Sequence, residues 1–515
     1  MHPLLGVGNR NSMKSSAPTS GRSAPPPRWR SALAMAVGLL VGACAGPRDA
    51  AEVESASQSP APRHVILLTV DTLRADHTSL HGYPRATTPF LQRLATSSTV
   101  FDHAIVQWPK TGTSFASMFT GRYPESTGLT HKAALRIPEE LPTLPESFRG
   151  RGFRTVAVVS NAVLSKELGW DRGFDEYVET WAGSQTEDPV EYRALLHAGR
   201  VNRLAFELLD RHRDAERLFL WVHYSDPHAP YILPPERDNP FLGDELFEQA
   251  EPTHVDLEGT SGKAIGDATD LRFYRAQYDA NVLEVDRALE AMVAELERRG
   301  LWADALAVIT ADHGESLGEH DLYFEHGPLP YNPSARVPLL VHGGGAPAGL
   351  RVGEAVELLG LAATLQRAVP RLQLDGAMLR EGRAWPLHPD PSSSPDVSGA
   401  AARVEAEPPL AFAGAGRGGR RHFRSVQDAV WKLVFTPPRD AARSRPDDFE
   451  LYDLKADPLE EQDVLDAHPD QVRRLRAPLL AWMERTAAVA PAATDDDEAS
   501  DPEALRALRA MGYVQ

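Results

Sequence analysis

The segment HVILLTVD at residues 64–71 decides the fold. It is a near-continuous apolar run that ends in a carboxylate, which is the pattern of a buried strand in a parallel sheet. The segment ALAVITADHG at residues 305–314 repeats the pattern and adds a histidine directly after the aspartate. Because ligands bind at the carboxyl ends of the strands in open α/β sheets, we expect Asp71, Asp312 and His313 to meet there at a metal site.

A short helix is predicted between these strands, in the segment WPKTGTSFASMFTGRYP at residues 108–124. Ser and Thr ahead of an apolar run mark a helix N-terminus, and Gly121 marks its end. Thr111 then lies at the helix start, where unpaired N–H groups and the helix dipole stabilise an alkoxide or a bound oxyanion. By itself the segment is more typical of a plain N-cap, but the two strands that end in aspartate favour a nucleophile.

Further motifs connect these segments to one family. The sequence resembles the sulfatase family of the alkaline-phosphatase superfamily over about residues 63–485, with the motifs in the family's order. The matching motifs are VDTLRAD (70–76), TGRYP (120–124), DPHAPY (226–231), TADHGESLGEH (310–320), RVPLLV (336–341) and ELYDLKADPLEEQDV (450–464). The resemblance implies an α/β fold, with an alkaline-phosphatase-like, mostly parallel sheet flanked by helices and a smaller C-terminal α+β subdomain.

Composition divides the chain into five segments. Residues 1–44 are predicted to be a lipoprotein-type signal peptide, because arginines precede an apolar run at residues 32–43 that is too short to span a bilayer. Residues 45–62, rich in Ala, Ser, Pro and Glu, are predicted to be a flexible linker. The remaining segments are a sulfatase-like catalytic domain (63–400), the C-terminal subdomain (401–490) and an acidic tail with a terminal apolar segment (491–515).

Cys44 is the only cysteine of the chain, so no intrachain disulfide is possible. It ends the run LVGAC, which looks like a bacterial lipobox. We therefore expect an exported bacterial lipoprotein of the cell envelope, held at the periplasmic or outer-membrane face through a lipid on Cys44. A buried structural thiol is the alternative, and the linker that follows Cys44 argues against it.

The charge balance limits the partners of the protein. The formal net charge of -18 argues against nucleic acid, because no basic stripe is present to displace counterions. An anionic sulfate- or phosphate-ester substrate must then be drawn by a local positive site.

The candidate catalytic cations are Lys110, Arg122, His228 and His326, which would balance the charge on a transferred sulfuryl or phosphoryl group. By the resemblance, His228 in DPHAPY matches the family's pocket histidine, which contacts the anion or protonates the leaving group. His326 falls near the place of a family lysine that touches the leaving group. A histidine fixed in a proline-rich turn is the alternative for His228, and Asp226 and His223 are weaker candidates.

Two departures from the family change the expected chemistry. Many sulfatases carry a Gly-Lys-Trp-His element after the strand at residues 155–160, whereas this chain has Ser160-Asn161-Ala162, so two contacts to the substrate anion are missing. We expect Asn161 to donate one hydrogen bond in their place. Sulfatases also oxidise the first residue of a Cys/Ser-x-Pro-x-Arg motif to formylglycine. The corresponding residues here are Thr111-Gly112-Thr113-Ser114-Phe115, and threonine cannot form that aldehyde.

An unmodified threonine is similar to what superfamily phosphodiesterases, phosphomutases and lipoteichoic-acid-synthase-like transferases use, in which a metal-bound Thr alkoxide attacks phosphorus. Because a hydroxyl is a poor nucleophile at neutral pH, we expect one divalent ion, held by Asp71, Thr111, Asp312 and His313. Thr72 stands where the family has a second aspartate, which weakens a calcium cage. Manganese, zinc or magnesium therefore suits the site at least as well as calcium.

The sequence thus predicts a metal-dependent ester hydrolase of the sulfatase family, and the threonine favours phosphate or phosphonate esters over sulfate esters. Two alternatives stay open. One is a phosphoryl-group transferase of the cell envelope. The other is a catalytically inactive, lipid-anchored binding protein, with which the missing Lys-x-His element and formylglycine residue are consistent.

Overall fold

The computed structural model describes residues 61–489, apart from residues 131–135, 185, 187, 258–262, 370–371, 388–407, 418–420 and 438–447. The expected signal peptide, nearly all of the expected linker and the expected acidic tail lie outside the described residues, and so does Cys44. The described residues belong to one compact unit. Within them, no helix combines the length and the apolar character needed to cross a bilayer.

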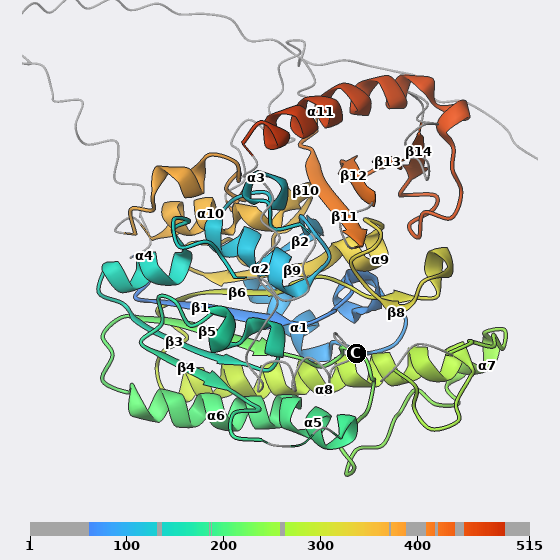
Figure 1. Ribbon diagram of the computed structural model, residues 1–515. Coiled ribbons are helices and arrows are strands. Elements are labelled where there is room, and N and C mark those ends of the chain that lie inside the picture. The colour runs from blue at the N-terminus through green and yellow to red at the C-terminus, as the bar shows by residue number, and fades with distance from the viewer. Residues whose placement is uncertain are drawn as a thin grey trace, which may run out of the picture. The chain divides into compact units, whose positions relative to one another are not determined.

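An eight-stranded sheet organises the fold (Figure 1). From one edge to the other its strands are β10 (Arg351–Glu357), β2 (Ser98–Ile105), β9 (Arg336–Gly343), β6 (Ala305–Ala311), β1 (His64–Val70), β5 (Leu218–Tyr224), β3 (Arg154–Val159) and β4 (Glu176–Glu179). β9 is antiparallel to both of its neighbours, and all other neighbouring pairs are parallel. The mostly parallel α/β sheet expected from the sequence is confirmed.

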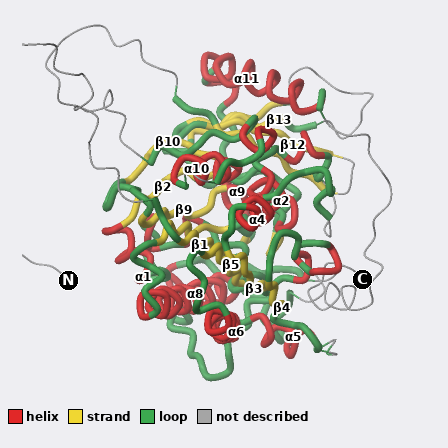
Figure 2. The backbone as a smooth tube through the Cα atoms, turned by 90° about the vertical axis from the view of Figure 1, so that its left-hand side faces the viewer, coloured by secondary structure: helices red, strands yellow, loops and turns green. Residues whose placement is uncertain are grey.

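Helices cover both faces of this sheet (Figure 2). One face carries α2 (Thr111–Thr120), α4 (Leu144–Gly150) and α10 (Leu361–Ala368), and the other carries α6 (Ala198–Arg211) and α8 (Leu271–Arg298). The side chains of β5 show this division. Phe219 stacks on Phe148 of α4 with 4.4 Å between ring centroids, whereas the Tyr224 hydroxyl donates to Asn202 Oδ1 of α6 at 2.7 Å. The other helices of this domain are α1 (Pro89–Leu94), α3 (Pro124–Thr127), α5 (Pro189–Leu196), α7 (Glu245–Gln249) and α9 (Asn332–Ala335).

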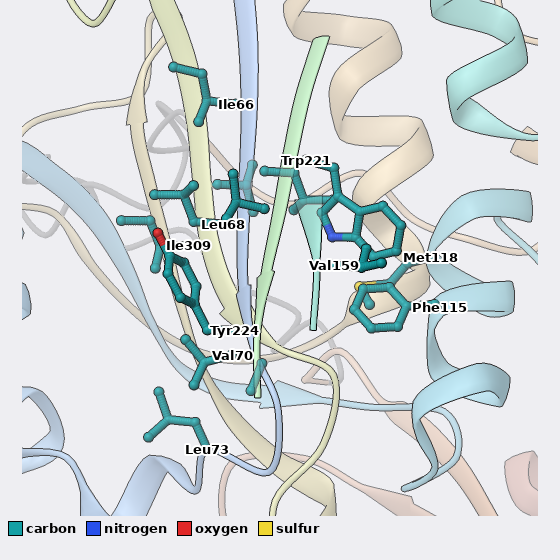
Figure 3. Packing of buried hydrophobic residues seen from close by; sticks show 14 of the residues in the cluster. Ile66, Leu68, Val70, Leu73, Phe115, Met118, Val159, Trp221, Tyr224 and Ile309 are labelled. Carbon is teal, nitrogen blue, oxygen red and sulfur yellow. The ribbon is translucent and has the colours of Figure 1, made fainter. Parts of the chain in front are cut away.

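The core beside β5 fixes α2 on the sheet (Figure 3). Phe115 and Met118 of α2 pack towards Trp221 of β5 and Val159 of β3, and the ring centroids of Phe115 and Trp221 lie 4.9 Å apart. All four side chains are buried. Burial of each such side chain contributes about 1.5–3 kcal/mol. This packing therefore holds the first residue of α2, Thr111, in a fixed place relative to the strand ends.

A second sheet and one long helix form the C-terminal subdomain (Figure 1). Its antiparallel strands are, in order, β11 (Ala411–Arg417), β12 (Arg421–Gln427), β13 (Trp431–Phe435) and β14 (Phe449–Asp453), and α11 (Pro469–Ala487) packs on them. In β11, Gly414 N donates to Gln107 O and Gly416 N donates to Gly327 O, both at 2.8 Å. A side chain at Gly414 would clash with Trp108, so glycine is needed for this close approach. The expected smaller α+β subdomain is confirmed.

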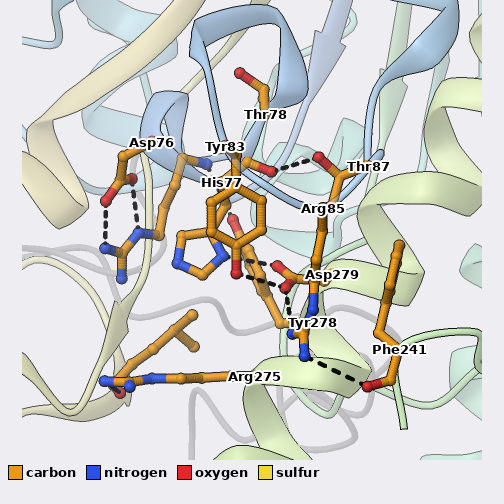
Figure 4. Close-up of polar contacts among 12 residues, drawn as sticks. Asp76, His77, Thr78, Tyr83, Arg85, Thr87, Phe241, Arg275, Tyr278 and Asp279 are labelled. Atoms are coloured by element: carbon orange, nitrogen blue, oxygen red, sulfur yellow. Dashed lines mark hydrogen bonds and ion pairs between the residues drawn. The ribbon is translucent and has the colours of Figure 1, made fainter. Parts of the chain in front are cut away.

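A buried polar network anchors the segment that follows β1 to α8 (Figure 4). Asp279 of α8 accepts hydrogen bonds from Tyr83 Oη and Arg85 Nη1 and contacts His77 Nδ1, each at 2.7 Å. Arg85 also forms a bidentate pair with Asp244, the N-cap residue of α7, at 2.7 and 2.8 Å. The network therefore holds the segment that contains α7 against the segment that follows β1.

A buried ion pair of the C-terminal subdomain also contacts the larger domain. Lys432 Nζ of β13 lies 2.7 Å from Glu460 Oε1, and both side chains are fully buried. Lys432 Nζ also donates to Pro330 O at 2.6 Å and to Asn332 Oδ1 at 3.1 Å. The ammonium group is thus bound on both sides of the boundary between the two sheets.

Breaking this pair on one side should be strongly destabilising. Lys432→Met should lower the free energy of unfolding by about 3–5 kcal/mol, because it leaves the Glu460 carboxylate buried without its cation. The double variant Lys432→Met/Glu460→Gln should recover part of the loss, since no unpaired charge remains. Urea unfolding followed by circular dichroism measures both. A single variant within about 1 kcal/mol of wild type would contradict the assignment.

Glu357 is expected to make stability depend on pH. Its carboxyl group accepts from Tyr123 Oη at 2.7 Å and from Phe412 N at 3.0 Å, and burial raises its pKa to about 7. Because the folded pKa lies above the unfolded value of about 4.5, this stabilising contribution is full below pH 4.5 and is lost as the pH rises through about 7. Over that window, urea unfolding should show wild type losing on the order of a few kcal/mol relative to Glu357→Gln. Parallel pH profiles would exclude this role.

Candidate active site

The parallel strand register brings the site together at the carboxyl edge of the sheet. Val70 at the end of β1 pairs with Tyr224 of β5 on one side and with Ala311 of β6 on the other. The next residue of each strand therefore lies at the same level. As a result, Asp71 and Asp312 stand side by side, and both are fully buried.

Thr111 is the first residue of α2, and Lys110 is its N-cap residue with extended backbone. The Thr111 hydroxyl does not cap the helix but lies 3.1 Å from His313 Nε2. Its side chain therefore points at the two strand ends rather than back at its own helix. The interpretation of Thr111 as a plain N-cap is wrong.

His313 presents an unprotonated nitrogen to the site. Its Nδ1 lies 2.9 Å from Gly314 O, which can only accept, so Nδ1 carries the proton and Nε2 keeps its lone pair. Nε2 faces Asp71 Oδ1 at 3.8 Å and Asp312 Oδ2 at 3.5 Å. Burial lowers the pKa of His313, which keeps the ring neutral as a ligand must be.

Each of the two aspartates has one oxygen held by the protein and one without a hydrogen-bond partner among the described residues. Asp71 Oδ2 accepts from Asn161 Nδ2 at 2.6 Å, and Asp312 Oδ1 accepts from the backbone N–H of His313 at 2.9 Å. Asp71 Oδ1 and Asp312 Oδ2 accept no hydrogen bond from the part of the chain that the structure describes. Burial and the neighbouring Asp71 raise the pKa of Asp312 well above its usual value.

These atoms fit a divalent cation. Two buried carboxylate oxygens without partners, one unprotonated imidazole nitrogen and one hydroxyl converge, and buried charge of this kind is normally paired or bound to metal. A further imidazole also lies within reach: Asp71, His223 and Asp312 each offer a ligand atom within 4.8 Å of the others. These carboxylate, imidazole and hydroxyl ligands are compatible with several divalent metal ions.

His223 was only a weaker candidate in the sequence, although the structure places it inside the site. It lies in β5 beside Thr69, whose Oγ1 is 3.0 Å from its Nδ1, and its Nε2 faces Asp71 Oδ2 at 3.7 Å. The sequence contained one sign of it, a histidine near the carboxyl end of an otherwise apolar strand. Which strand would be the neighbour of β1 was not readable from the sequence.

Asn161 contacts one of the two aspartates. Its amide nitrogen donates to Asp71 Oδ2 at 2.6 Å, and its amide oxygen accepts from Val163 N at 3.0 Å. Both ends of the side chain are therefore engaged in holding the carboxylate and the local turn. Because the amide nitrogen carries two hydrogens and Asp71 takes one, the contact between Asn161 and the substrate anion stays a prediction.

His228 and His326 are both brought to the site. The His326 ring stacks on His313 with 4.1 Å between centroids, and His228 meets His326 edge-on at 5.3 Å. His326 Nδ1 lies 3.0 Å from Glu315 Oε1. Burial lowers the pKa of His228 to about 4 and that of His326 well below its usual value. Burial therefore favours the neutral form of both rings in the free protein, and their role in balancing the charge of a transferred group stays a prediction.

The two remaining predicted cations differ in their positions. Lys110 precedes Thr111 directly, and a side chain at Gly327 would meet Lys110 Cε at 2.7 Å, so the lysine stem packs on the chain that follows His326. Arg122 follows the far end of α2, about 15 Å along the helix from Thr111, and pairs with Glu381 at 3.4 Å. The structure does not bring Arg122 to the site, because a rigid helix separates the two residues.

The fold and the site define an ester hydrolase of the alkaline-phosphatase superfamily. The family model described as Sulfatase matches residues 63–368. The chain belongs to the sulfatase family.

Individual relatives are distant in sequence. The chain is 25% identical to a choline-sulfatase of Rhizobium meliloti (strain 1021) over 417 residues, which cover 72% of this chain and 76% of that protein. Among solved structures, a 2-O GAG sulfatase superposes with a TM-score of 0.63 at 19% identity, covering 83% of this chain and 92% of that one. The phosphonate monoester hydrolase of Silicibacter pomeroyi superposes with a TM-score of 0.62 at 18% identity, covering 82% and 96%.

Metal binding should be visible as a stabilisation. Adding Mn²⁺, Zn²⁺, Mg²⁺ or Ca²⁺ to chelator-treated protein should raise the Tm, because an ion that binds only the folded state stabilises it by about 2.7 kcal/mol at 100 times its Kd. Asp312→Ala should abolish the shift. Asp304→Ala, which removes an exposed carboxylate at the opposite end of β6, should keep it. If none of the four ions shifts the Tm of wild type, these carboxyl groups do not hold a cation.

Proposed function

We propose that the protein is a metal-dependent hydrolase of phosphate, phosphonate or sulfate esters in which the Thr111 hydroxyl is the nucleophile. The observation that carries this proposal is the position of Thr111 Oγ1, 3.1 Å from His313 Nε2 and beside two carboxylate oxygens without partners. The unmodified threonine supports a preference for phosphorus esters. Since both a sulfatase and a phosphonate hydrolase share the fold, the fold itself does not select the ester.

The groups at the site have three separate roles in this proposal. Asp71, Asp312, His313 and Thr111 would hold the divalent ion, which supplies the positive charge that makes the hydroxyl acidic and polarises the ester. The N-terminus of α2 adds its unpaired N–H groups and dipole where negative charge develops. Lys110 adds a fixed charge beside the nucleophile.

The reaction has two balanced steps. First, Thr111 Oγ1 forms a bond to phosphorus or sulfur and releases its proton to solvent, and the bond from phosphorus or sulfur to the leaving oxygen breaks. An alkoxide leaving group takes a proton from His228, whose pKa rises when an anionic ester lies beside it. His228 regains from solvent the proton that it gives to the leaving group. Water then hydrolyses the threonine ester, which releases phosphate, phosphonate or sulfate and restores the hydroxyl.

The cellular setting is also part of the proposal. The LVGAC run that ends at Cys44 supports an exported bacterial lipoprotein of the cell envelope, with the catalytic domain tethered to a membrane. A lipid on Cys44 would keep the enzyme near envelope substrates. Mass spectrometry of the membrane fraction from a bacterial host that processes lipoproteins, with Cys44→Ala as the comparison, tests this placement.

Replacing the nucleophile should remove turnover without removing the fold. Thr111→Ala should lower kcat/KM by on the order of 10³-fold or more, and Thr111→Ser should keep measurable activity because it keeps the hydroxyl. The matched control is Thr120→Ala, at the other end of α2, whose hydroxyl bonds only Ala116 O at 2.6 Å. Release of p-nitrophenol from its phosphate, phosphodiester, phenylphosphonate and sulfate esters is measured with each divalent ion supplied.

The same assay separates the alternatives. Activity that persists in Thr111→Ala would assign the nucleophile elsewhere. Turnover that requires an added alcohol acceptor would identify a phosphoryl transferase. Absence of turnover on every ester with every ion would support the binding-protein alternative and contradict the proposed hydrolase.

A further inference from the structure

Arg193 is a buried arginine whose guanidinium group is only partly bonded. It lies on α5, its side chain is 3% exposed, and Nη1 donates to Ser225 O at 3.2 Å. Within the described part of the chain, Nε and Nη2 have no hydrogen-bond partner. Native proteins seldom leave buried donors unpaired, and a charged donor is the most costly kind.

The obvious counter-ion of Arg193 is already engaged. Asp226 Oδ1 lies 3.6 Å from Arg193 Nη2, which is an ion-pair distance but not a hydrogen bond. Asp226 Oδ1 is instead 3.0 Å from His197 Nδ1, and Asp226 Oδ2 accepts from Ala198 N at 2.9 Å. Asp226 therefore balances part of the charge without satisfying the donors.

The two unpaired nitrogens form the edge of the guanidinium that binds oxyanions. In this same protein, Nε and Nη2 of Arg74 bind the two oxygens of Asp76 at 3.0 and 2.7 Å. Nε and Nη2 of Arg85 likewise bind Asp244 at 2.8 and 2.7 Å. Arg193 offers an identical fork, which matches two oxygens of a carboxylate, phosphate or sulfate group.

Arg193 is held next to the candidate active site. Ser225 O, its anchor, also accepts from the backbone N–H of His228 at 2.8 Å, so the arginine binds the turn that carries this histidine. Ser225 follows β5 directly, at the level of Asp71 in β1. Burial lowers the pKa of Arg193, whereas the carboxylates of Asp226 and Asp71 raise it.

The site needs such a cation. Asp71, Asp312 and Glu315 are all fully buried there, so an anionic ester meets negative charge that one divalent ion only partly offsets. The Lys-x-His element that many sulfatases place after β3 is missing, and the Asn161 amide is bound to Asp71. None of the three residues in the Ser160-Asn161-Ala162 segment carries a charge.

We propose that Arg193 binds two non-bridging oxygens of the substrate's phosphate, phosphonate or sulfate group through Nε and Nη2, in place of the missing Lys-x-His element. This inference rests on the proposed function and adds the residue that recognises the anion. Nη1 stays bonded to Ser225 O, so the fork is oriented before the substrate arrives. Preorganisation of this kind lets the charge act on the transferred group without reordering the site.

The test measures anion affinity separately from turnover. Isothermal titration of inorganic phosphate and inorganic sulfate into the metal-loaded full chain should show the Kd rising about 10- to 100-fold in Arg193→Gln, the loss expected for hydrogen bonds from a charged group. Arg193→Lys should recover part of the affinity, because it keeps the charge and loses the fork. The matched control is Arg200→Gln, which removes a half-buried arginine that donates to Thr180 O at 2.9 Å.

Kinetics with the best p-nitrophenyl ester should follow the same order, with KM raised in Arg193→Gln, an intermediate KM in Arg193→Lys and an unchanged KM in Arg200→Gln. A merely structural role predicts a different pattern: both Arg193 variants would lower the Tm, and the Kd for phosphate and sulfate would not change. That pattern, or an unchanged Kd and KM in Arg193→Gln, overturns the inference. If Arg193→Gln does not fold, the Kd of Arg193→Lys decides in the same way.

Failure of this inference can be told apart from failure of the proposed function. Wild type should bind phosphate or sulfate whether or not it hydrolyses an ester, whereas Arg193→Gln should bind both anions about 10- to 100-fold more weakly. That result upholds the role of Arg193 even if no ester is hydrolysed. Hydrolysis that depends on Thr111 together with unchanged anion affinity in Arg193→Gln would leave the proposed function standing and remove Arg193 from it.

Discussion

The structure depends on two buried carboxylates that stand side by side. Asp71 and Asp312 follow adjacent parallel strands, and each keeps one oxygen without a donor among the described residues. Burial raises the pKa of Asp312, and repulsion by the neighbouring Asp71 carboxylate raises it further. A divalent cation bound between them would offset this repulsion. The unprotonated Nε2 of His313 and the Thr111 hydroxyl lie beside these two carboxylates. All four groups could therefore bind one cation at this edge of the sheet.

This arrangement requires that segments far apart in the chain do not move. The core packing of α2 holds Thr111, and the register of β1, β5 and β6 holds the strand ends. The C-terminal sheet adds a second support, because β11 bonds to Gln107, shortly before the nucleophile, and to Gly327, directly after His326. Among the described residues, that sheet supplies no side chain to the site. Its contribution is to hold the two loops on which Thr111 and His326 are carried.

Burial acts against the expected positive charge of the site's histidines. Burial lowers the pKa values of His228 and His326 in the free protein, and Arg122 follows the end of α2 that is far from Thr111. Positive charge near the nucleophile before substrate binds then comes from Lys110 at the start of α2 and from the Arg193 guanidinium beside the His228 turn. An enzyme that meets anionic esters with fixed charges depends less on pH for binding than one that relies on histidine.

The sequence by itself determined the fold class, the two strands that end in aspartate and the placement of Thr111 at a helix start. Those features are local, since apolar periodicity and helix punctuation are written in consecutive residues. Only the tertiary structure decided that His223 faces Asp71, that Asn161 is bound to Asp71, and that Arg122 lies outside the site. It also brought Arg193 from α5, a segment without any motif, to the carbonyl group of Ser225. Strand order, register and the direction of a helix axis fix these contacts, and no short stretch of sequence encodes them.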